Sequence, residues 1–188
     1  MTPTEDDSWD AGDMGCGELV LDLRFRLLAM PGRVLKLVAT DAGAPEDIRR
    51  LVLPCLPHLD SLIINDYEAG VLTGIDLVST GVTSAGAARR AAVALLVSGP
   101  LELVAIHFPG GCVAVTRDGD VYAKASLEVP ADAIKGGNGA GDAFAAGLLY
   151  GLHEGWPISE GLSLALCAAA SALRSVSTTA TVGSIAEC

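Results

Sequence analysis

The residues with the clearest chemical potential lie in a glycine-rich stretch, residues 136–142 (GGNGAGD). Four of its first six residues are glycine, which is disfavoured inside helices, so the stretch predicts a loop whose backbone can approach another group closely. Residues 143–152 are strong helix formers, so the loop leads into the start of a helix. Free amides and the dipole at a helix start attract anions. Asp142 falls in that first turn, where a carboxylate is electrostatically favoured.

An anion-binding loop beside an aspartate fits phosphoryl transfer. The amides can hold the negative charge that develops on the transferred group, and Asp142 can take the proton of an attacking hydroxyl. The same pattern also fits a capped helix that packs tightly on a strand without a ligand, and the loop alone does not decide between the two. A P-loop is excluded because Lys135 precedes the loop instead of ending it. A dinucleotide fingerprint is excluded because the spacing is G-x-G-x-G-D and occurs late in the chain.

Short apolar runs and helical patterns alternate around this loop. The apolar runs are too continuous for strands with one solvated face, so they predict a mostly parallel sheet with helices on both faces, an α/β fold. The predicted strands are residues 34–39, 60–65 and 101–108, and an Asp-Gly turn predicts a hairpin between residues 112–116 and 121–123. The predicted helices are residues 19–30, one opening at Pro45, 66–72, 85–97 after a Ser84 cap, 139–152 and 157–173.

The composition limits the classes of function. With 188 residues, 51% of them hydrophobic, the chain is long enough for one domain with a large core. The net charge of −11 argues against nucleic-acid binding, which needs clustered lysine and arginine. An acidic protein can still bind ATP through backbone amides, a helix start and a metal ion. The five cysteines show no metal-ligand spacing and predict neither a zinc site nor disulfides.

Membrane and targeting signals are absent from the sequence. No apolar run approaches the length that a membrane span needs. Residues 1–13 carry five acidic residues and no basic one, the opposite of a signal or transit peptide. We therefore expect a cytoplasmic protein with no membrane partner.

Two motifs resemble those of a known family. The nine residues 139–147 (GAGDAFAAG) closely resemble the C-terminal signature of the ribokinase-like (PfkB) carbohydrate kinases, and this signature is highly specific. Residues 65–68 (NDYE), after a predicted buried strand, resemble the weaker N-x-x-E motif of the same family, in the expected order and at the expected distance. The resemblance covers roughly residues 34–175. It implies a ribokinase-like three-layer sandwich and ATP-dependent phosphoryl transfer to a hydroxyl of a sugar, a nucleoside or a related small molecule.

The resemblance implies roles for the residues of the signature. Asp142 is the expected general base, and the amides of Gly139, Ala140 and Gly141 are the expected anion hole. Asn138, Gly139 and Gly141 are expected to contact ATP. The implied cofactors are ATP and Mg²⁺, together with a monovalent cation where a family member has a site for it.

The family's nucleotide-contacting turn, T-x-G-x-x-G, corresponds to the segment after the strand at residues 101–108. His107 stands where threonine is common, and Pro109 replaces a glycine. We expect His107 and Gly111 to contact ATP; His107 alternatively packs as a hydrogen-bonded residue. The family signature also usually begins with Asp-Thr, whereas residues 136–137 are both glycine, which removes an acid that could support a cation.

The N-x-x-E motif is the expected metal site. The resemblance implies that Glu68, with Asn65, orders Mg²⁺ and its waters near the phosphates, which suits the preference of this ion for oxygen ligands. The alternative is structural: Asn65 caps a helix and Glu68 is a solvated acid in its first turn.

Family members are substantially longer than this chain, and nothing before Val34 resembles their N-terminal half. We therefore expect residues 1–33 to be an acidic tail and atypical segment, and residues 34–188 to be the C-terminal portion of a kinase domain, without the N-terminal strands and lid. An exposed sheet edge would then favour a homodimer. Poor exclusion of water would leave sugar phosphorylation weak or absent. The rival function is a non-catalytic nucleotide- or partner-binding module with a kinase-like fold.

Overall fold

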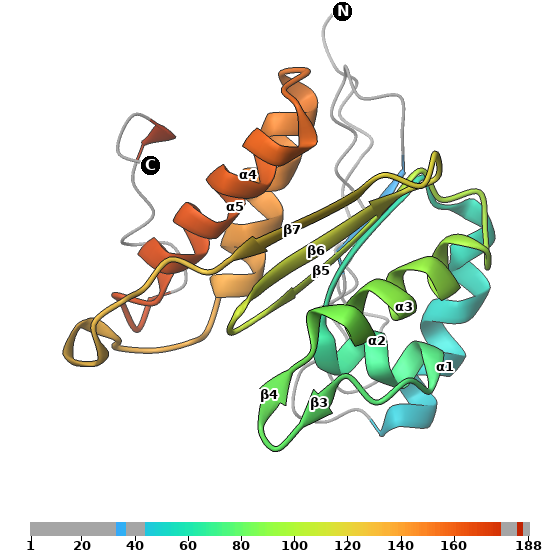
Figure 1. The fold of residues 1–188 in the computed structure, drawn as a ribbon, viewed down its shortest axis with the longest axis horizontal. Coiled ribbons are helices and arrows are strands. Elements are labelled where there is room, and N and C mark those ends of the chain that lie inside the picture. The colour runs from blue at the N-terminus through green and yellow to red at the C-terminus, as the bar shows by residue number, and fades with distance from the viewer. Residues whose placement is uncertain (1–32, 37–43, 178–183, 186–188) are drawn as a thin grey trace, which may run out of the picture.

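A five-stranded mixed sheet forms the centre of the computed structural model, which describes residues 33–36, 44–177 and 184–185 (Figure 1). The strand order is β1-β2-β5-β6-β7. The β1–β2 and β2–β5 pairs are parallel, and the β5–β6 and β6–β7 pairs are antiparallel. The strands are β1 (Val34–Lys36), β2 (Ser61–Asn65), β5 (Leu103–Phe108), β6 (Gly111–Thr116) and β7 (Val121–Ala125).

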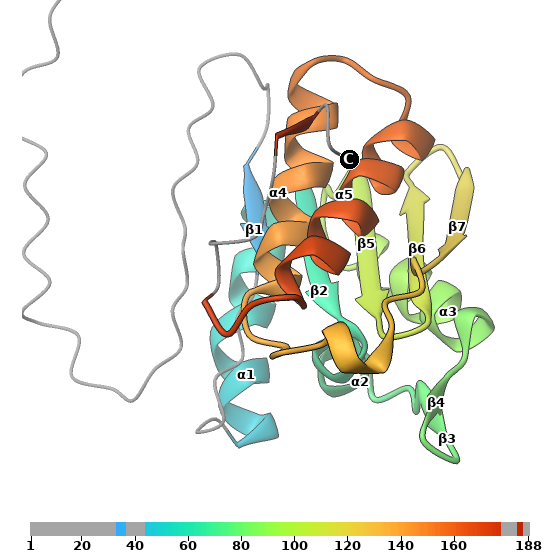
Figure 2. The same ribbon diagram turned by 90° about the vertical axis from the view of Figure 1, so that its left-hand side faces the viewer.

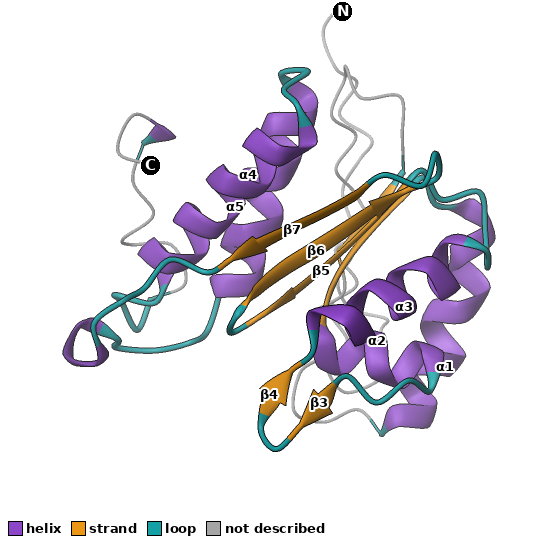
Figure 3. Cartoon of the chain, in the orientation of Figure 1, coloured by secondary structure: helices purple, strands orange, loops and turns teal. Residues whose placement is uncertain are grey.

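Helices cover both faces of this sheet, which confirms the predicted three-layer fold (Figure 3). One face packs against α1 (Pro45–Val52), α2 (Asp66–Thr73) and α3 (Ala85–Leu96), and the other against α4 (Ala140–His153) and α5 (Ile158–Ala172). Side chains of β2 alternate between the two layers. Leu62 and Ile64 are buried with α1–α3, whereas Ile63 is buried with α4 and α5. Continuous apolar strands therefore result from burial on both faces.

Local sequence signals set the starts and ends of the helices on the first face. Pro45 occupies the first turn of α1, where its missing N–H costs no helical hydrogen bond. The Ser84 side chain accepts a hydrogen bond from the Ala87 amide and caps α3. Gly74 ends α2 with a φ of 72°, in the left-handed region that favours glycine.

Several segments differ from the predictions or lie outside them. The sequence did not predict the hairpin of β3 (Val78–Ser79) and β4 (Val82–Thr83) or the 3₁₀ turns Leu53–His58 and Ala131–Ala133. The predicted helix at residues 19–30 and the acidic tail lie outside the described residues. Within the described part of the chain, no helix is long and apolar enough to cross a membrane.

Helices α4 and α5 pack against each other at close range, side by side over the sheet (Figure 2). A Cβ atom added to Gly147 would lie 2.7 Å from the Cα of Ala165, and one added to Gly151 would lie 2.7 Å from the Cα of Gly161. The small residues let the two backbones approach each other. This contact positions the N-terminus of α4, where the glycine-rich loop ends.

Candidate active site

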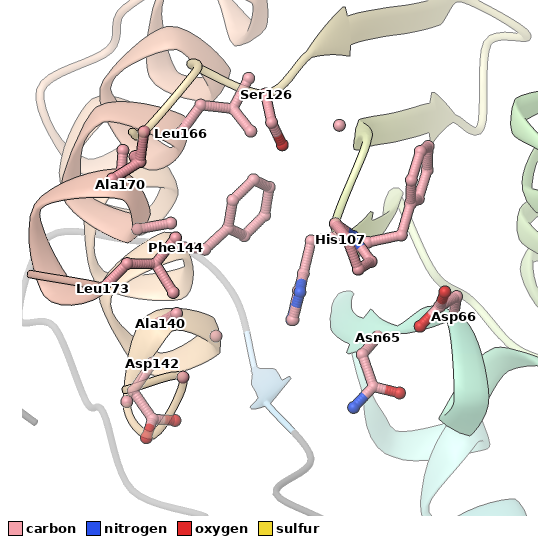
Figure 4. Close-up of a pocket in the computed structure, with 18 of the residues that line it drawn as sticks. Asn65, Asp66, His107, Ser126, Ala140, Asp142, Phe144, Leu166, Ala170 and Leu173 are labelled. Carbon is pink, nitrogen blue, oxygen red and sulfur yellow. The ribbon is translucent and has the colours of Figure 1, made fainter. Parts of the chain in front are cut away.

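A cavity of about 690 Å³ lies where the glycine-rich loop meets the ends of β2 and β5 (Figure 4). Its wall comes from segments that are far apart in the sequence, including the starts of α2 and α4, the β5–β6 turn and the C-terminal part of α5. All of the residues that the sequence singled out for the site line this one cavity: Asn65, Glu68, His107, Gly111, Asn138, Gly139, Ala140, Gly141 and Asp142.

Two neighbouring parallel strands bring polar residues to the cavity. Asn65 is the last residue of β2, and it is in register with His107 near the end of β5. Parallel strands present their carboxyl ends at the same edge of a sheet, where ligands of α/β proteins commonly bind. The topology therefore places the N-x-x-E motif beside the turn after β5.

The start of α2 is closed by its own side chains. The amide of Glu68 donates to Oδ1 of Asn65 at 2.8 Å, and the amide of Asn65 donates to Oε2 of Glu68 at 2.9 Å. This reciprocal pair is a capping box. Asn65 therefore caps the helix, as the structural alternative predicted. Glu68 is not the solvated acid of that alternative, because it is only 1% exposed. Carboxylate and amide oxygens carry further lone pairs, so capping leaves them able to accept another hydrogen bond.

Asp66 is an additional acidic residue in the cavity wall, and the sequence did not predict it as a site residue. Its Oδ1 accepts from the Tyr67 amide at 3.0 Å, and the hydroxyl of Thr83 donates to its Oδ2. Asp66 thus links the β3–β4 hairpin to the cavity. The only sequence feature that could have indicated Asp66 as a site residue is its position inside the N-x-x-E motif.

The start of α4 is built differently. Gly139 is the N-cap residue, with a φ of 82°, and it offers no side chain to cap the helix. The amide of Ala143 donates to the Gly139 carbonyl at 2.8 Å, whereas the Ala140 amide makes only a long bond of 3.4 Å to the Gly137 carbonyl. Amides in a first helical turn have no carbonyl partner within the helix. Asp142 is exposed in this turn, and Figure 4 shows it at the same end of the cavity as Ala140.

His107 packs against an aromatic ring in the middle of the cavity. Its ring centroid is 5.0 Å from that of Phe144, at an interplanar angle of 39°. Figure 4 shows the imidazole between Phe144 and the pair Asn65 and Asp66. The half-buried His107 therefore both packs and faces the cavity. Phe144 belongs to the signature motif, but the sequence pattern predicted no role for it.

Gly111 is required where the β5–β6 turn meets β7. Its φ is 153°, and an added Cβ atom would lie 2.1 Å from the carbonyl oxygen of Lys124. A side chain at this position would therefore displace the neighbouring strand. The backbone of the turn stays in the cavity wall because the residue is glycine.

An apolar wall forms another part of the cavity. It combines the segment after β7 with α5, through Leu127, Val129, Ile134, Leu166, Ala169 and Leu173. The alanines in the C-terminal part of α5 have two roles. Ala169 and Ala170 line the cavity, whereas Ala168 and Ala172 are buried against α4. Such a surface suits a flat apolar group.

The charged side chains of the cavity wall are acidic. Asp66, Glu68 and Asp142 line it, and none of the described residues in the wall is a lysine or an arginine. No cluster of three or more His, Cys, Asp or Glu residues in the described ranges could hold a metal ion. Mg²⁺ usually binds one or two carboxylates, phosphate oxygens and waters, so these acids fit an ion that arrives with a phosphate ligand.

Comparison with known proteins places the chain in a single protein family. The model of the pfkB family carbohydrate kinases matches residues 34–184. The chain is 38% identical over 63 residues to a 5-dehydro-2-deoxygluconokinase from Geobacillus thermodenitrificans, a match that covers 34% of this chain and 18% of the relative.

Solved structures share the fold. Arabidopsis thaliana ribokinase complexed with ribose and ATP matches with a TM-score of 0.61 and 20% identity, over 71% of this chain and 41% of the ribokinase. A putative ribokinase II from E. coli in complex with ATP and Mg²⁺ matches with a TM-score of 0.60 and 19% identity, over 76% of this chain and 42% of that structure. The chain therefore spans about two fifths of the length of these structures.

Proposed function

Because this chain belongs to the pfkB family of carbohydrate kinases, we propose that it catalyses the transfer of a phosphoryl group from ATP to a hydroxyl of a sugar or a related small molecule in the cytoplasm. The observation that supports this most is the convergence of the uncapped α4 start, Asp142 and the Asn65–Glu68 pair on a single cavity. Phosphoryl transfer depends on positioning and on stabilising negative charge, which such an arrangement supplies.

Each part of the α4 start has a role in this proposal. The amides of Gly139, Ala140 and Gly141 donate to the oxygens of the terminal phosphoryl group. The acceptor oxygen attacks phosphorus, the bond to the leaving oxygen of ADP breaks, and Asp142 takes the proton of the acceptor hydroxyl. The exposure of Asp142 leaves its carboxylate accessible to an acceptor that enters the cavity.

The α2 start supplies the metal-binding side of the cavity. Glu68 and Asn65, which line the cavity with the neighbouring carboxylate Asp66, would hold Mg²⁺ through its waters. The ion neutralises charge on the phosphates when it is bound. The capping box holds Glu68 and Asn65 in one geometry before any ligand arrives, since each bonds to the other's amide. That rigidity is what a positioning site requires.

The remaining contacts are assigned to the nucleotide. Asn138, Gly139, Gly141 and Gly111 contribute backbone to the wall near the phosphates. The apolar wall around Leu127 and Leu166 accepts the base. The ribokinase complexes with ATP support ATP as the donor, and the ribose complex supports a sugar as the acceptor.

Sugar-dependent release of ADP by the full chain, measured over a panel of sugars and nucleosides, tests this function. We expect Asp142→Asn to lower turnover by about 10²–10⁴-fold, the usual contribution of a general base, while ATP binding is retained. The matched control is Asp118→Asn, the same change at an exposed turn between β6 and β7, which should leave turnover unchanged. Equal turnover in Asp142→Asn and wild type would exclude Asp142 as the base.

A second candidate is a non-catalytic nucleotide- or partner-binding module, which the altered nucleotide-contacting turn favours, since His107 and Pro109 replace the family's usual threonine and glycine there. Calorimetric titration with ATP, with and without Mg²⁺, separates the two candidates when combined with the turnover assay. Binding without turnover for any acceptor would support the module. Absence of ATP binding to a folded chain would contradict both nucleotide-dependent candidates.

A further inference from the structure

We propose that Thr83 is a positioning residue for the metal-binding side of the cavity: its hydroxyl orients the Asp66 carboxylate, and through that carboxylate it sets how tightly the chain with ATP holds Mg²⁺. Thr83 does not line the cavity itself. The inference rests on the proposed function, because it requires ATP and Mg²⁺ in the cavity. It gives the β3–β4 hairpin, which follows α2 in the chain, a role in the site.

The Asp66 carboxylate is held at both of its oxygens. Its Oδ1 accepts from the Tyr67 amide at 3.0 Å, and its Oδ2 accepts from the hydroxyl of Thr83, which lies 17 residues further along the chain. The carboxylate therefore cannot rotate without losing one of these bonds. Each oxygen keeps a further lone pair that can accept from the cavity. Figure 4 shows Asp66 next to Asn65, on the side of the cavity away from Asp142.

Thr83 is itself anchored by the structure around it. It is in register with Val78 across the β3–β4 pair. The next residue, Ser84, donates its amide to the carbonyl of Leu77 at 2.9 Å and caps α3 with its side chain. Leu77 is only 3% exposed, so this anchor reaches into the core. The hairpin and the start of α3 together hold the Thr83 hydroxyl in one place relative to α2.

An oriented carboxylate matters for Mg²⁺ because this ion demands near-octahedral geometry and usually binds through one or two carboxylates, phosphate oxygens and waters. Glu68 is 1% exposed, and its Oε2 already accepts from the Asn65 amide. Asp66 is half-buried and is the more accessible carboxylate on this side. A residue that fixes the direction of a metal-binding side chain raises the affinity for the metal without touching it. Thr83 has that relation to Asp66.

The test measures ATP binding to the full chain by calorimetry over a range of Mg²⁺ concentrations. Thr83→Val keeps the shape of the side chain, suits a strand and removes the hydroxyl. We expect the Mg²⁺ concentration that gives half of the effect on ATP binding to rise about 10- to 100-fold, as for other residues that orient a metal ligand. ATP affinity at saturating Mg²⁺ should stay unchanged. Weaker ATP binding at saturating Mg²⁺ would indicate a general distortion of the cavity and would overturn the inference.

Two control variants isolate the hydroxyl of Thr83. Thr73→Val is the same change in α2, where the Thr73 hydroxyl donates to the Ala69 carbonyl at 2.7 Å outside the cavity wall, and it should leave the Mg²⁺ dependence unchanged. Thr83→Ser keeps the donor and should behave like wild type. If Thr83→Val does not fold, Thr83→Ser is compared with Thr83→Ala, which differs from it by one hydroxyl. Equal Mg²⁺ dependence in this pair would overturn the inference.

A double variant tests whether Thr83 acts through Asp66. Asp66→Ala should raise the half-effect Mg²⁺ concentration at least as much as Thr83→Val does. Adding Thr83→Val to Asp66→Ala should then have no further effect, because the carboxylate that Thr83 orients is gone. Additive effects of the two changes would show that Thr83 acts by another route and would contradict the proposed positioning.

The remaining outcomes separate this inference from the proposed function. An unchanged half-effect concentration in folded Thr83→Val would overturn the role of Thr83 and leave the kinase proposal standing, since sugar-dependent ADP release tests that proposal independently. Wild-type ATP binding that does not respond to Mg²⁺ would overturn the inference together with the metal assignment of the proposed function. A folded wild-type chain that does not bind ATP would overturn both proposals.

Discussion

The starts of α2 and α4 face the same cavity, but their amides are satisfied in opposite ways. At α2, Asn65 and Glu68 cap the helix reciprocally, with hydrogen bonds of 2.8 and 2.9 Å. At α4, Gly139 provides no capping side chain, and the Ala140 amide makes only a long bond to a neighbouring carbonyl. One helix start is capped by its own side chains, whereas the other lacks a side-chain cap and has first-turn amides of the kind that bind anions.

This difference has an energetic meaning. A capping side chain contributes only about a few tenths of a kcal/mol more than glycine at an N-cap, and the α4 start, with Gly139 there, lacks that contribution. The left-handed φ of 82° at Gly139 favours glycine over residues whose side chains could cap the helix. The uncapped start of α4 therefore lowers the free energy of unfolding slightly, at a position where a bound anion would raise it again.

The largest expected effect on stability is a difference between the acidic residues at the two helix starts, Glu68 and Asp142. Glu68→Ala should lower the free energy of unfolding by about 2–4 kcal/mol, because it leaves the Asn65 amide without its acceptor and opens a cavity around a residue that is 1% exposed. Asp142→Ala removes an exposed acid and should cost less than about 1 kcal/mol. Urea unfolding of both variants measures the contrast. Equal losses would show that the two helix starts do not differ as described.

A smaller effect concerns the packing that positions the α4 start. Gly147→Ala should lower stability by about 1–3 kcal/mol and weaken ATP binding, because its Cβ would lie 2.7 Å from Ala165 and would push α4 away from α5. Gly86→Ala is the matched control in α3, where the nearest atom to the added Cβ is 3.7 Å away. It should be neutral or stabilise the chain by up to about 1 kcal/mol. Thermal unfolding and ATP calorimetry on both variants check this, and a neutral Gly147→Ala would contradict the close contact.

The next effect separates capping from ligand binding. Asn65→Ala and Ser84→Ala each remove the N-cap side chain of a helix, so each should cost about 1 kcal/mol in urea unfolding. Only Asn65 lines the cavity, so only Asn65→Ala should weaken the Mg²⁺ dependence of ATP binding in calorimetry. If Ser84→Ala weakens it equally, the effect comes from stability and not from the site.

The smallest effect at neutral pH comes from Cys112, which lies in the core under α4 and α5. Burial raises the pKa of this thiol from 9.0 to about 11. The unfolded chain therefore releases the proton first, so the free energy of unfolding should be insensitive to this group below pH 9 and should fall as the pH rises from 9 to about 11. Urea unfolding of wild type and Cys112→Ala over this range measures the difference. A parallel decline in both proteins would contradict the raised pKa.

Local signals explain which elements could be predicted from the sequence. Pro45, Ser84 and Gly74 mark helix boundaries through their own backbone or side-chain chemistry, and the structure has helices there. The β3–β4 hairpin has strands of only two residues each, too short to show an alternating pattern, so it was not predicted.

The site was predictable only where it coincides with the family motifs. Asp142 and Glu68 could be predicted because they occupy fixed positions in the two family motifs, and both line the cavity. The burial of Glu68 depends on how α2 packs against the sheet, which no local pattern contains. The contact between His107 and Phe144 and the apolar wall at Leu127 likewise arise from tertiary packing between distant segments.

The most direct test of the contrast between the two helix starts is a backbone-assigned ¹H–¹⁵N spectrum of the chain, titrated with ATP and Mg²⁺. We predict that the amides of Gly139, Ala140 and Gly141 shift most, because they gain an anionic acceptor. The Glu68 amide should move little, because it stays bonded to Asn65. Larger shifts at Glu68 than at residues 139–141 upon ATP binding would contradict the account.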